Sequence, residues 1–422
     1  MKGAALITLA LLPLLPALNI GGFDTHSVRL VVPLLAAGFF VSGLVHRTMR
    51  IPLHPAGWFF FSFLSFATLS ALWAQDPVVV FRKAAVLWGV GAASAYLGFV
   101  IASLDTNQRV GKGFLVAAML AGSAAIVQFF AQFAAGPSKV IAAIKTISPW
   151  LWGESTSNAA FFFSSFFVEV GNQTFLRAFF PFPDPHTSGL FLGMTAFPAL
   201  AFLYVRGWRR DVTLGAFAFV ALAVLLSFSR GSWIAFLAGL MTFLALAWQK
   251  LPSGLRYLAL VGCAVVTITV FLVPALRTRA ASTFNFQEGS IAARLALWKE
   301  TGKVFRMSPL LGVGLGNLAP ALSPGEPFRT PTNAHNLFLE IAAETGLVGL
   351  ALFLGALGAA WVTFIRKQTL AAKGFAGGLT VFIVHSLFET TLYSPQVLFV
   401  AAFLIGLASV TGSCVSTEDK RI

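Results

Sequence analysis

Long apolar segments alternate with short polar turns along most of this 422-residue sequence. A membrane-spanning helix needs about 20 apolar residues to cross the hydrocarbon core of a bilayer. The pattern predicts about twelve such helices, at residues 4–21, 29–45, 57–74, 84–103, 113–134, 188–205, 212–228, 232–248, 256–275, 336–364, 372–389 and 393–411. Because no internal repeat and no low-complexity linker separates them, we expect an all-α polytopic membrane protein with a single integral domain over residues 1–422.

The composition favours a membrane protein over a soluble one. Hydrophobic residues make up 57% of the chain and charged residues 10%, whereas soluble domains carry about 25% charged residues. A bilayer can accommodate this much apolar surface, and a soluble core cannot. The apolar run from Met1 to Ile20 resembles a signal peptide, but no small-residue cleavage site follows it, so we expect a retained first helix.

Basic loops predict the orientation of these helices. The net charge of +14 is explained by basic cytoplasmic loops rather than by nucleic-acid binding, because short cytoplasmic loops of membrane proteins are enriched in Lys and Arg. With twelve spans, four loops with basic residues and the C-terminal tail fall on one side, so both termini are expected in the cytoplasm. The residues concerned are Arg47, Arg50, Arg206, Arg209, Arg210, Lys250, Arg256, Arg366, Lys367, Lys373, Lys420 and Arg421.

Two long loops, 135–187 and 276–335, then lie outside the cytoplasm. The first contains an aromatic run, Phe161–Phe167 with two serines, that is too short to span and either lies at the membrane interface or packs under the loop. The second has four more basic than acidic residues, and is either an ordinary solvated loop or an anion-binding surface. Its charged residues are Arg277, Arg279, Glu288, Arg294, Lys299, Glu300, Lys303, Arg306, Glu326 and Arg329.

Several ionisable residues are predicted at the outer ends of the helices. A charged residue inside a span costs about 2.5–3.5 kcal/mol on insertion scales, so its placement is informative. Arg230, His186 and His335 each stand next to a span, and His385 and Glu389 share a face of the eleventh helix. We therefore expect binding or chemistry at the outer face.

Glu340 and Glu344 form a second pair on one helical face, deeper in the predicted tenth helix. Either each carboxylate satisfies a neighbouring helix, or Glu340 orients a catalytic group above it. The sequence leaves both interpretations open.

Five motifs carry a family resemblance. His335 and Asn336 are followed by nine residues and then by Gly346-x-x-Gly349, with Gly346 about 16 Å along the helix, where a small residue lets another helix approach. The others are Ser229-Arg230-Gly231, Arg294 with Trp298, the glycines 312, 314 and 316, and Arg177 with Asp184-Pro185-His186. Together they resemble the O-antigen ligase and O-antigen polymerase superfamily of membrane glycan transferases, over roughly residues 170–400.

The resemblance implies a reaction and roles for the residues. The donor is a glycan on undecaprenyl diphosphate, and the acceptor is lipid A-core or a growing polysaccharide. Arg230 and Arg294 are expected to hold the diphosphate, because an arginine fork grips phosphate oxygens, and His335 is expected to take the proton of the acceptor hydroxyl. The expected supporting residues are Arg177, His186, Asn336, Glu340, His385 and Glu389, although the Asp-Pro-His order around His186 departs from the family pattern.

The resemblance calls for no cofactor, and no closely spaced acidic pair occurs in the predicted outer loops. Since a divalent metal with a phosphate donor usually needs such a pair, we expect metal-independent transfer. The site would face outward from the bacterial inner membrane, among membrane lipids and without nucleic acid.

Alternatives remain within and outside the family. The His-Asn spacing favours a ligase slightly over a polymerase, and the extra outer segments of protein-glycosylating relatives are not evident. A transporter for a lipid-linked oligosaccharide would share the apolar helices, but it predicts an inverted repeat and charges at the midplane. A purely structural scaffold would not need the outer arginines and histidines.

Overall fold

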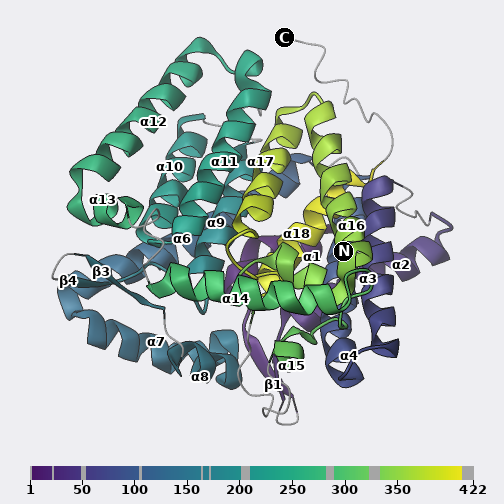
Figure 1. The fold of residues 1–422 in the computed structure, drawn as a ribbon. Helices are drawn as coiled ribbons and strands as arrows, with labels where there is room; N and C mark the ends of the chain where they lie inside the picture. The colour runs from purple at the N-terminus through teal and green to yellow at the C-terminus, as the bar shows by residue number, and fades with distance from the viewer. Residues whose placement is uncertain are drawn as a thin grey trace.

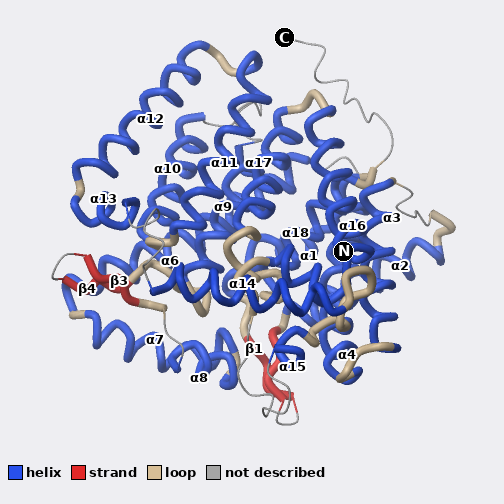
Figure 2. The backbone as a smooth tube through the Cα atoms, in the orientation of Figure 1, coloured by secondary structure: helices blue, strands red, loops and turns tan. Residues whose placement is uncertain are grey.

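The computed structural model describes residues 2–20, 23–48, 54–103, 107–162, 165–170, 173–200, 210–281, 289–322 and 333–410. These residues form a bundle of helices with two small β-hairpins (Figures 1 and 2). The helices are α1 (Lys2–Leu11), α2 (Val28–Val45), α3 (Pro55–Leu69), α4 (Pro77–Val86), α5 (Ala93–Ala102), α6 (Asn107–Ala135), α7 (Pro137–Trp152), α8 (Glu154–Phe162), α9 (Pro185–Ala199), α10 (Arg210–Leu226), α11 (Arg230–Ala247), α12 (Ser253–Leu272), α13 (Pro274–Ala281), α14 (Gly289–Met307), α15 (Leu318–Leu322), α16 (Leu337–Arg366), α17 (Leu370–His385) and α18 (Pro395–Ala408).

A helix lies on each of the predicted membrane segments. Among the described residues, six helical runs are long and apolar enough to cross a bilayer, namely Val28–Val45, Pro55–Leu72, Pro77–Ala102, Arg109–Ala135, Arg230–Lys250 and Leu337–Arg366. Shorter apolar helices occupy Lys2–Leu14, Leu370–His385 and Pro395–Ala408. The structure thus confirms a predominantly helical membrane protein, while the number of twelve spans and the side of each terminus stay predictions.

The first helix is shorter than predicted. It ends at Leu11, a 3₁₀ turn continues to Leu14, and strand β1 begins at Ala17. Pro13 and Pro16 explain the difference, because proline removes a backbone donor and its ring disfavours a continuing helix. The expectation of one helix over residues 4–21 was therefore wrong, because β1 (Ala17–Ile20) instead pairs antiparallel with β2 (Phe23–His26).

Glycines allow the closest helix contacts in the core. A Cβ added at Gly98 on α5 or at Gly406 on α18 would overlap a backbone oxygen of the facing helix. The same holds for Gly374 on α17 against α9. Small residues are what membrane helices use to pack closely, since water does not drive them together.

Helix α16 is broken at Gly346, where φ is 65° and ψ is −169°. A loop after α14 enters the break: the Val313 amide donates to the Ala343 carbonyl at 3.0 Å, and the Leu347 amide donates to the Pro309 carbonyl at 2.8 Å. Non-helical backbone is tolerated within a membrane protein when its polar groups are satisfied in this way. Gly346 was expected to admit another helix, but a Cβ there would meet the backbone of Leu310. The break fixes the end of α14 against α16.

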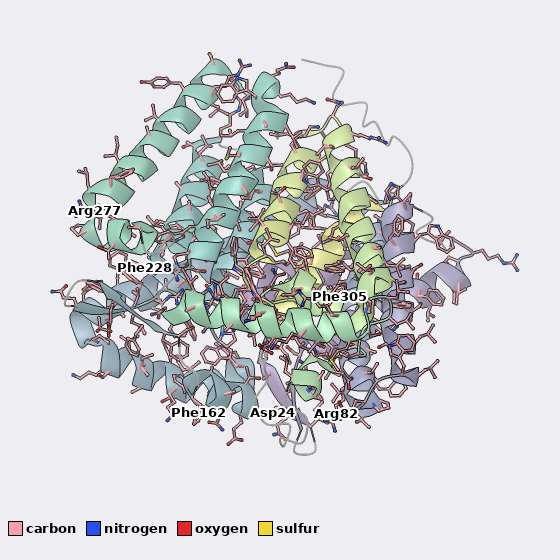
Figure 3. All side chains as sticks on the ribbon, in the orientation of Figure 1. Asp24, Arg82, Phe162, Phe228, Arg277 and Phe305 are labelled. Carbon is pink, nitrogen blue, oxygen red and sulfur yellow. The ribbon has the colours of Figure 1, made fainter. Side chains whose placement is uncertain are left out.

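The two ends of the bundle differ in character. Lys250, after α11, donates to the Gln368 carbonyl between α16 and α17, so these two turns meet at one end. The opposite end carries α7, α8, α15 and the hairpins, and Asp24, Arg82 and Phe162 lie there in Figure 3. The two long predicted loops are therefore folded: the first holds α7, α8 and the hairpin of β3 (Phe167–Val170) with β4 (Gln173–Leu176), and the second holds α13 to α15.

The aromatic run of the first loop packs beneath that loop in part. Phe166 is buried and stacks on Phe179, with ring centroids 4.3 Å apart. Phe161 approaches Phe166 at 5.3 Å, whereas Phe162 at the end of α8 is 80% exposed. Of the two expected roles, internal packing accounts for Phe161 and Phe166.

Candidate active site

His335 stands at the start of α16, at the end of that helix away from the Lys250 turn. Asn336 is the N-cap, and its side-chain oxygen accepts from the Leu339 amide at 3.0 Å. The Leu337 amide donates to the Ser386 carbonyl at 2.8 Å, which ties this turn to the end of α17. His335 itself has a φ of 48°, a conformation that is uncommon for a non-glycine residue and is held by its surroundings.

Glu389 joins three of the predicted residues. Its Oε2 accepts from His335 Nδ1 at 2.7 Å, and its Oε1 accepts from the Arg294 guanidinium. His186 Nδ1 lies 3.7 Å from the same Oε1. We expected Glu389 within a helix that also carried His385, but α17 ends at His385, and the Glu389 amide donates back to the His385 carbonyl across one turn.

The contacts within this cluster shift the pKa values of Glu389 and His335 in the directions that favour an ion pair between them. Burial raises the pKa of Glu389, but the hydrogen bond from His335 and the charge of Arg294 oppose it, and the pKa lies well below its usual range. The hydrogen bond to Glu389 raises the pKa of His335, against the opposing effect of burial. Glu389 is therefore a carboxylate, and His335 is a stronger base than an isolated histidine.

Arg294 comes from α14, which crosses the bundle below α16 and α17 in Figure 1. The loop after α14 is anchored in the α16 break, so α14 is held beside the start of α16. The Arg294 side chain stays 25% exposed while it binds Glu389. Since a guanidinium carries five N–H donors, it can serve Glu389 and a further anion together.

His186 enters the site from the first turn of α9. Asp184 caps this helix, and its carboxylate accepts from the amides of His186 at 2.9 Å and Thr187 at 2.8 Å. Pro185 occupies the first helical position, which suits its fixed φ. The Asp-Pro-His order thus forms a cap that presents His186 to Ser229 and Glu389, at 2.9 Å and 3.7 Å from Nδ1.

Arg230 and Arg177 take different places near this cluster. Arg230 is the first residue of α11 and follows Ser229, whose hydroxyl contacts His186. Arg177 is only 3% exposed, and it donates to the carbonyls of Ser227 at 2.7 Å and Ser165 at 3.0 Å. Arg177 therefore supports the turn that presents Arg230.

Residues 215–354 match a family model described as O-antigen ligase. This segment is thus an O-antigen ligase family domain, which supports the O-antigen ligase superfamily for the protein. The matched segment contains Arg230, Arg294 and His335, while His186 and Glu389 lie outside it. No curated protein matches the chain.

The match to the O-antigen ligase family indicates a glycosyltransferase-like membrane protein with lipid-linked glycan and polysaccharide substrates. The cluster of Arg294, His335 and Glu389 brings together a guanidinium and a histidine on one carboxylate. Within the described residues, no group of three or more His, Cys, Asp or Glu side chains is arranged to hold a metal ion. Metal-independent transfer stays a prediction.

Glu340 and Glu344 lie below the cluster of Arg294, His335 and Glu389. The sequence left two roles open for them, satisfying a neighbouring helix or orienting the site, and the structure shows contacts of both kinds. Lys83 on α4 lies 3.2 Å from Glu344 and 3.8 Å from Glu340, so both acids satisfy a neighbouring helix. Glu340 Oε2 also accepts from the Ala334 amide at 2.9 Å, directly before His335. Glu340 thus fixes the backbone that leads to His335.

Sequence reasoning missed several partners in and below the site. It gave no role to Lys83, to the ring of Tyr393, which lies 4.3 Å from Lys83 Nζ, or to the hydroxyls of Ser229 and Ser232. Lys83 left a usable signal, because it is a cation directly before the predicted span 84–103. Tyr393 and the serines left none, since only the folded chain brings them to their partners.

Proposed function

We propose that this protein transfers a glycan from undecaprenyl diphosphate to an acceptor hydroxyl at the outer face of the bacterial inner membrane, as an O-antigen ligase that uses lipid A-core. The pairing of His335 with Glu389, next to Arg294, is the observation that carries the proposal. A polymerase of the same superfamily would use the same donor with a growing polysaccharide as acceptor.

The position of the cluster supports an outward-facing site. His335 starts α16, whereas Lys250 and Gln368 meet at the other end of the helices α11, α16 and α17. That other end carries Lys250, Arg366 and Lys367, which the positive-inside rule assigns to the cytoplasm. The cluster then lies at the outer end of the same helices.

His335 is the proposed base. With its Nδ1–H donated to Glu389, the neutral ring has its lone pair on Nε2. Nε2 takes the proton of the acceptor hydroxyl while that oxygen forms a bond to the anomeric carbon of the glycan. The bond from the anomeric carbon to the diphosphate oxygen breaks, and its electron pair leaves with undecaprenyl diphosphate. The imidazolium that forms is stabilised by Glu389.

Arg230 and Arg294 are the proposed diphosphate ligands. Charge builds on the leaving diphosphate as the glycosidic bond breaks, and preorganised guanidinium groups stabilise that charge. Arg294 is positioned by Glu389, and Arg230 by the first turn of α11. Arginine suits this role because its planar fork binds two phosphate oxygens together.

The proposal is tested by reconstituting the wild-type protein in proteoliposomes with glycan-linked undecaprenyl diphosphate. Lipid A-core, the free repeat-unit carrier and a serine-containing peptide are supplied as separate acceptors. Transfer to lipid A-core supports the ligase, and elongation of the carrier-linked glycan indicates the polymerase. Movement of the intact carrier across the bilayer without transfer to any acceptor would overturn the proposal in favour of a transporter.

A further inference from the structure

A chain of hydrogen bonds runs from the bundle interior to His186. His385 Nε2 lies 3.2 Å from Ser232 Oγ, Ser232 Oγ donates to Ser229 Oγ at 2.8 Å, and Ser229 Oγ lies 2.9 Å from His186 Nδ1. His385, Ser229 and Ser232 are at most 1% exposed, whereas the His186 side chain is 20% exposed. The chain thus links a buried histidine on α17, through the start of α11, to a histidine at the site.

The surrounding helix makes room for this chain. Gly189 on α9 faces the Ser232 hydroxyl, and a Cβ at this glycine would overlap the Ser232 side chain. Ser229 also caps α11 by accepting from the Ser232 amide at 3.4 Å, so its hydroxyl proton remains available. The three contacts are therefore fixed by helix packing and by a helix cap.

The number of protons on each group fixes which group donates in each hydrogen bond from His385 to His186. Ser232 gives its single hydroxyl proton to Ser229, so it can only accept from His385, whose proton must then be on Nε2. His385 Nδ1 agrees with this assignment, because it is buried and has no hydrogen-bond partner among the described residues. Ser229 accepts from Ser232 and has its own proton left for His186 Nδ1. The neutral His186 ring must then carry its proton on Nε2.

We propose that His385, Ser232 and Ser229 are positioning residues that hold His186 in the Nε2–H tautomer, so that His186 donates a hydrogen bond to a phosphate oxygen of the lipid diphosphate. The proposal rests on the function proposed above. His186 Nε2 has no hydrogen-bond partner within the described part of the chain. Its ring lies beside Glu389, which also binds Arg294, so His186 stands at the cluster where the diphosphate is proposed to bind.

The tautomer can be measured without any enzymatic activity. The chain has six histidines, so ¹⁵N-histidine labelling gives a small set of ring signals, and the His186→Gln variant identifies those of His186. At mildly alkaline pH we expect His186 to show a protonated Nε2 and an unprotonated Nδ1. A wild-type His186 with its proton on Nδ1 would refute the proposed direction of the chain.

Variants then test whether the hydrogen bonds through Ser232 and Ser229 control the tautomer of His186. In Ser232→Ala, Ser229 loses its donor and can accept from His186 Nδ1–H, so we expect a mixture of the two His186 tautomers. Ser188→Ala is the matched control, because Ser188 is a buried hydroxyl on α9, the helix of His186, with no partner among the described residues. An unchanged His186 signal in Ser232→Ala would show that the chain does not set the tautomer.

Donor binding separates this inference from the proposed function. Undecaprenyl diphosphate alone should shift the His186 Nε2 signal of the wild-type protein, and the absence of any shift would overturn the phosphate contact while leaving the tautomer result standing. In transfer assays, His186→Leu should raise the KM for the donor about tenfold or more, since it removes a hydrogen bond to a charged group. His186→Gln keeps an N–H near the Nε2 position and should raise it by only about threefold. Equal losses in the two variants would contradict the donor role.

Discussion

His335 Nδ1 and Glu389 Oε2 lie 2.7 Å apart, although 54 residues separate them in the chain. Glu389 also binds Arg294, so one carboxylate orients both the proposed base and a proposed diphosphate ligand. Replacing Glu389 with Gln should therefore lower kcat by about 10²-fold or more, the range typical of a lost general acid–base function. Glu300→Gln is the control, because Glu300 is half-exposed and pairs with Lys303 away from this cluster. Comparable losses in both variants would contradict a specific role for Glu389.

The pH dependence of transfer should report on His335. The base form of a histidine grows as pH rises through its pKa, and Glu389 raises that pKa above the ordinary value of 6.5. Since the pKa of Glu389 lies well below its usual range, Glu389 stays ionised over the same pH range. We predict that kcat increases with pH through the raised pKa of His335, and that the increase begins at lower pH in Glu389→Gln. Its displacement to higher pH in that variant would be inconsistent with the His335–Glu389 pair.

The break in α16 should require glycine at position 346. Gly346→Ala places a Cβ on the backbone of Leu310 at a positive φ, so we expect a loss of about 1–3 kcal/mol in stability or more. Gly358→Ala in the same helix is the control, because a Cβ there meets no atom within 4 Å. Thermal unfolding in detergent compares the two, and equal midpoints would show that the loop contact does not constrain this position.

Lys83 should contribute to stability through two carboxylates. Lys83→Met leaves Glu340 and Glu344 without their cation, and breaking a buried pair typically costs about 3–5 kcal/mol. The exposed neighbour Arg82 provides a matched control as Arg82→Met. Adding Glu340→Gln and Glu344→Gln to Lys83→Met should recover part of the loss, because no unpaired charge then remains. If Lys83→Met unfolds at the same temperature as Arg82→Met, the three-residue pairing is not a source of stability.

Transfer should proceed without a divalent metal. The arginines supply the positive charge that a metal would otherwise bring to the diphosphate. We therefore expect an excess of EDTA to leave the initial rate unchanged within about twofold, a change of less than about 0.5 kcal/mol in the barrier. Loss of turnover with EDTA, followed by recovery with Mg²⁺ or Mn²⁺, would show that the prediction is wrong.

The sequence predicted the parts of the fold and site that depend on local patterns. Apolar runs marked where the membrane helices lie, and the His335-Asn336 and Ser229-Arg230-Gly231 motifs marked two helix starts that the structure confirms. Proline positions carried the information that α1 ends at Leu11, but hydropathy alone extended that helix to residue 21.

Relationships between distant residues could not be predicted. Glu389 meets Arg294 across 95 residues and Lys83 meets Glu344 across 261, and no periodicity encodes such contacts. Gly346 is a related case, because the sequence alone does not distinguish a glycine that packs against a neighbouring helix from a glycine that breaks its own helix. Only the hydrogen bonds of the 309–314 loop distinguish the two roles.

The most direct test of the central claim compares His335→Ala with His46→Ala in the reconstituted transfer assay, at saturating donor and acceptor. His46 is an exposed histidine outside the cluster. We predict that His46→Ala transfers glycan at the wild-type rate, while His335→Ala folds and binds undecaprenyl diphosphate but loses about 10²–10⁴-fold in kcat. A folded His335→Ala protein that transfers glycan as fast as His46→Ala would contradict the assignment of His335 as the base.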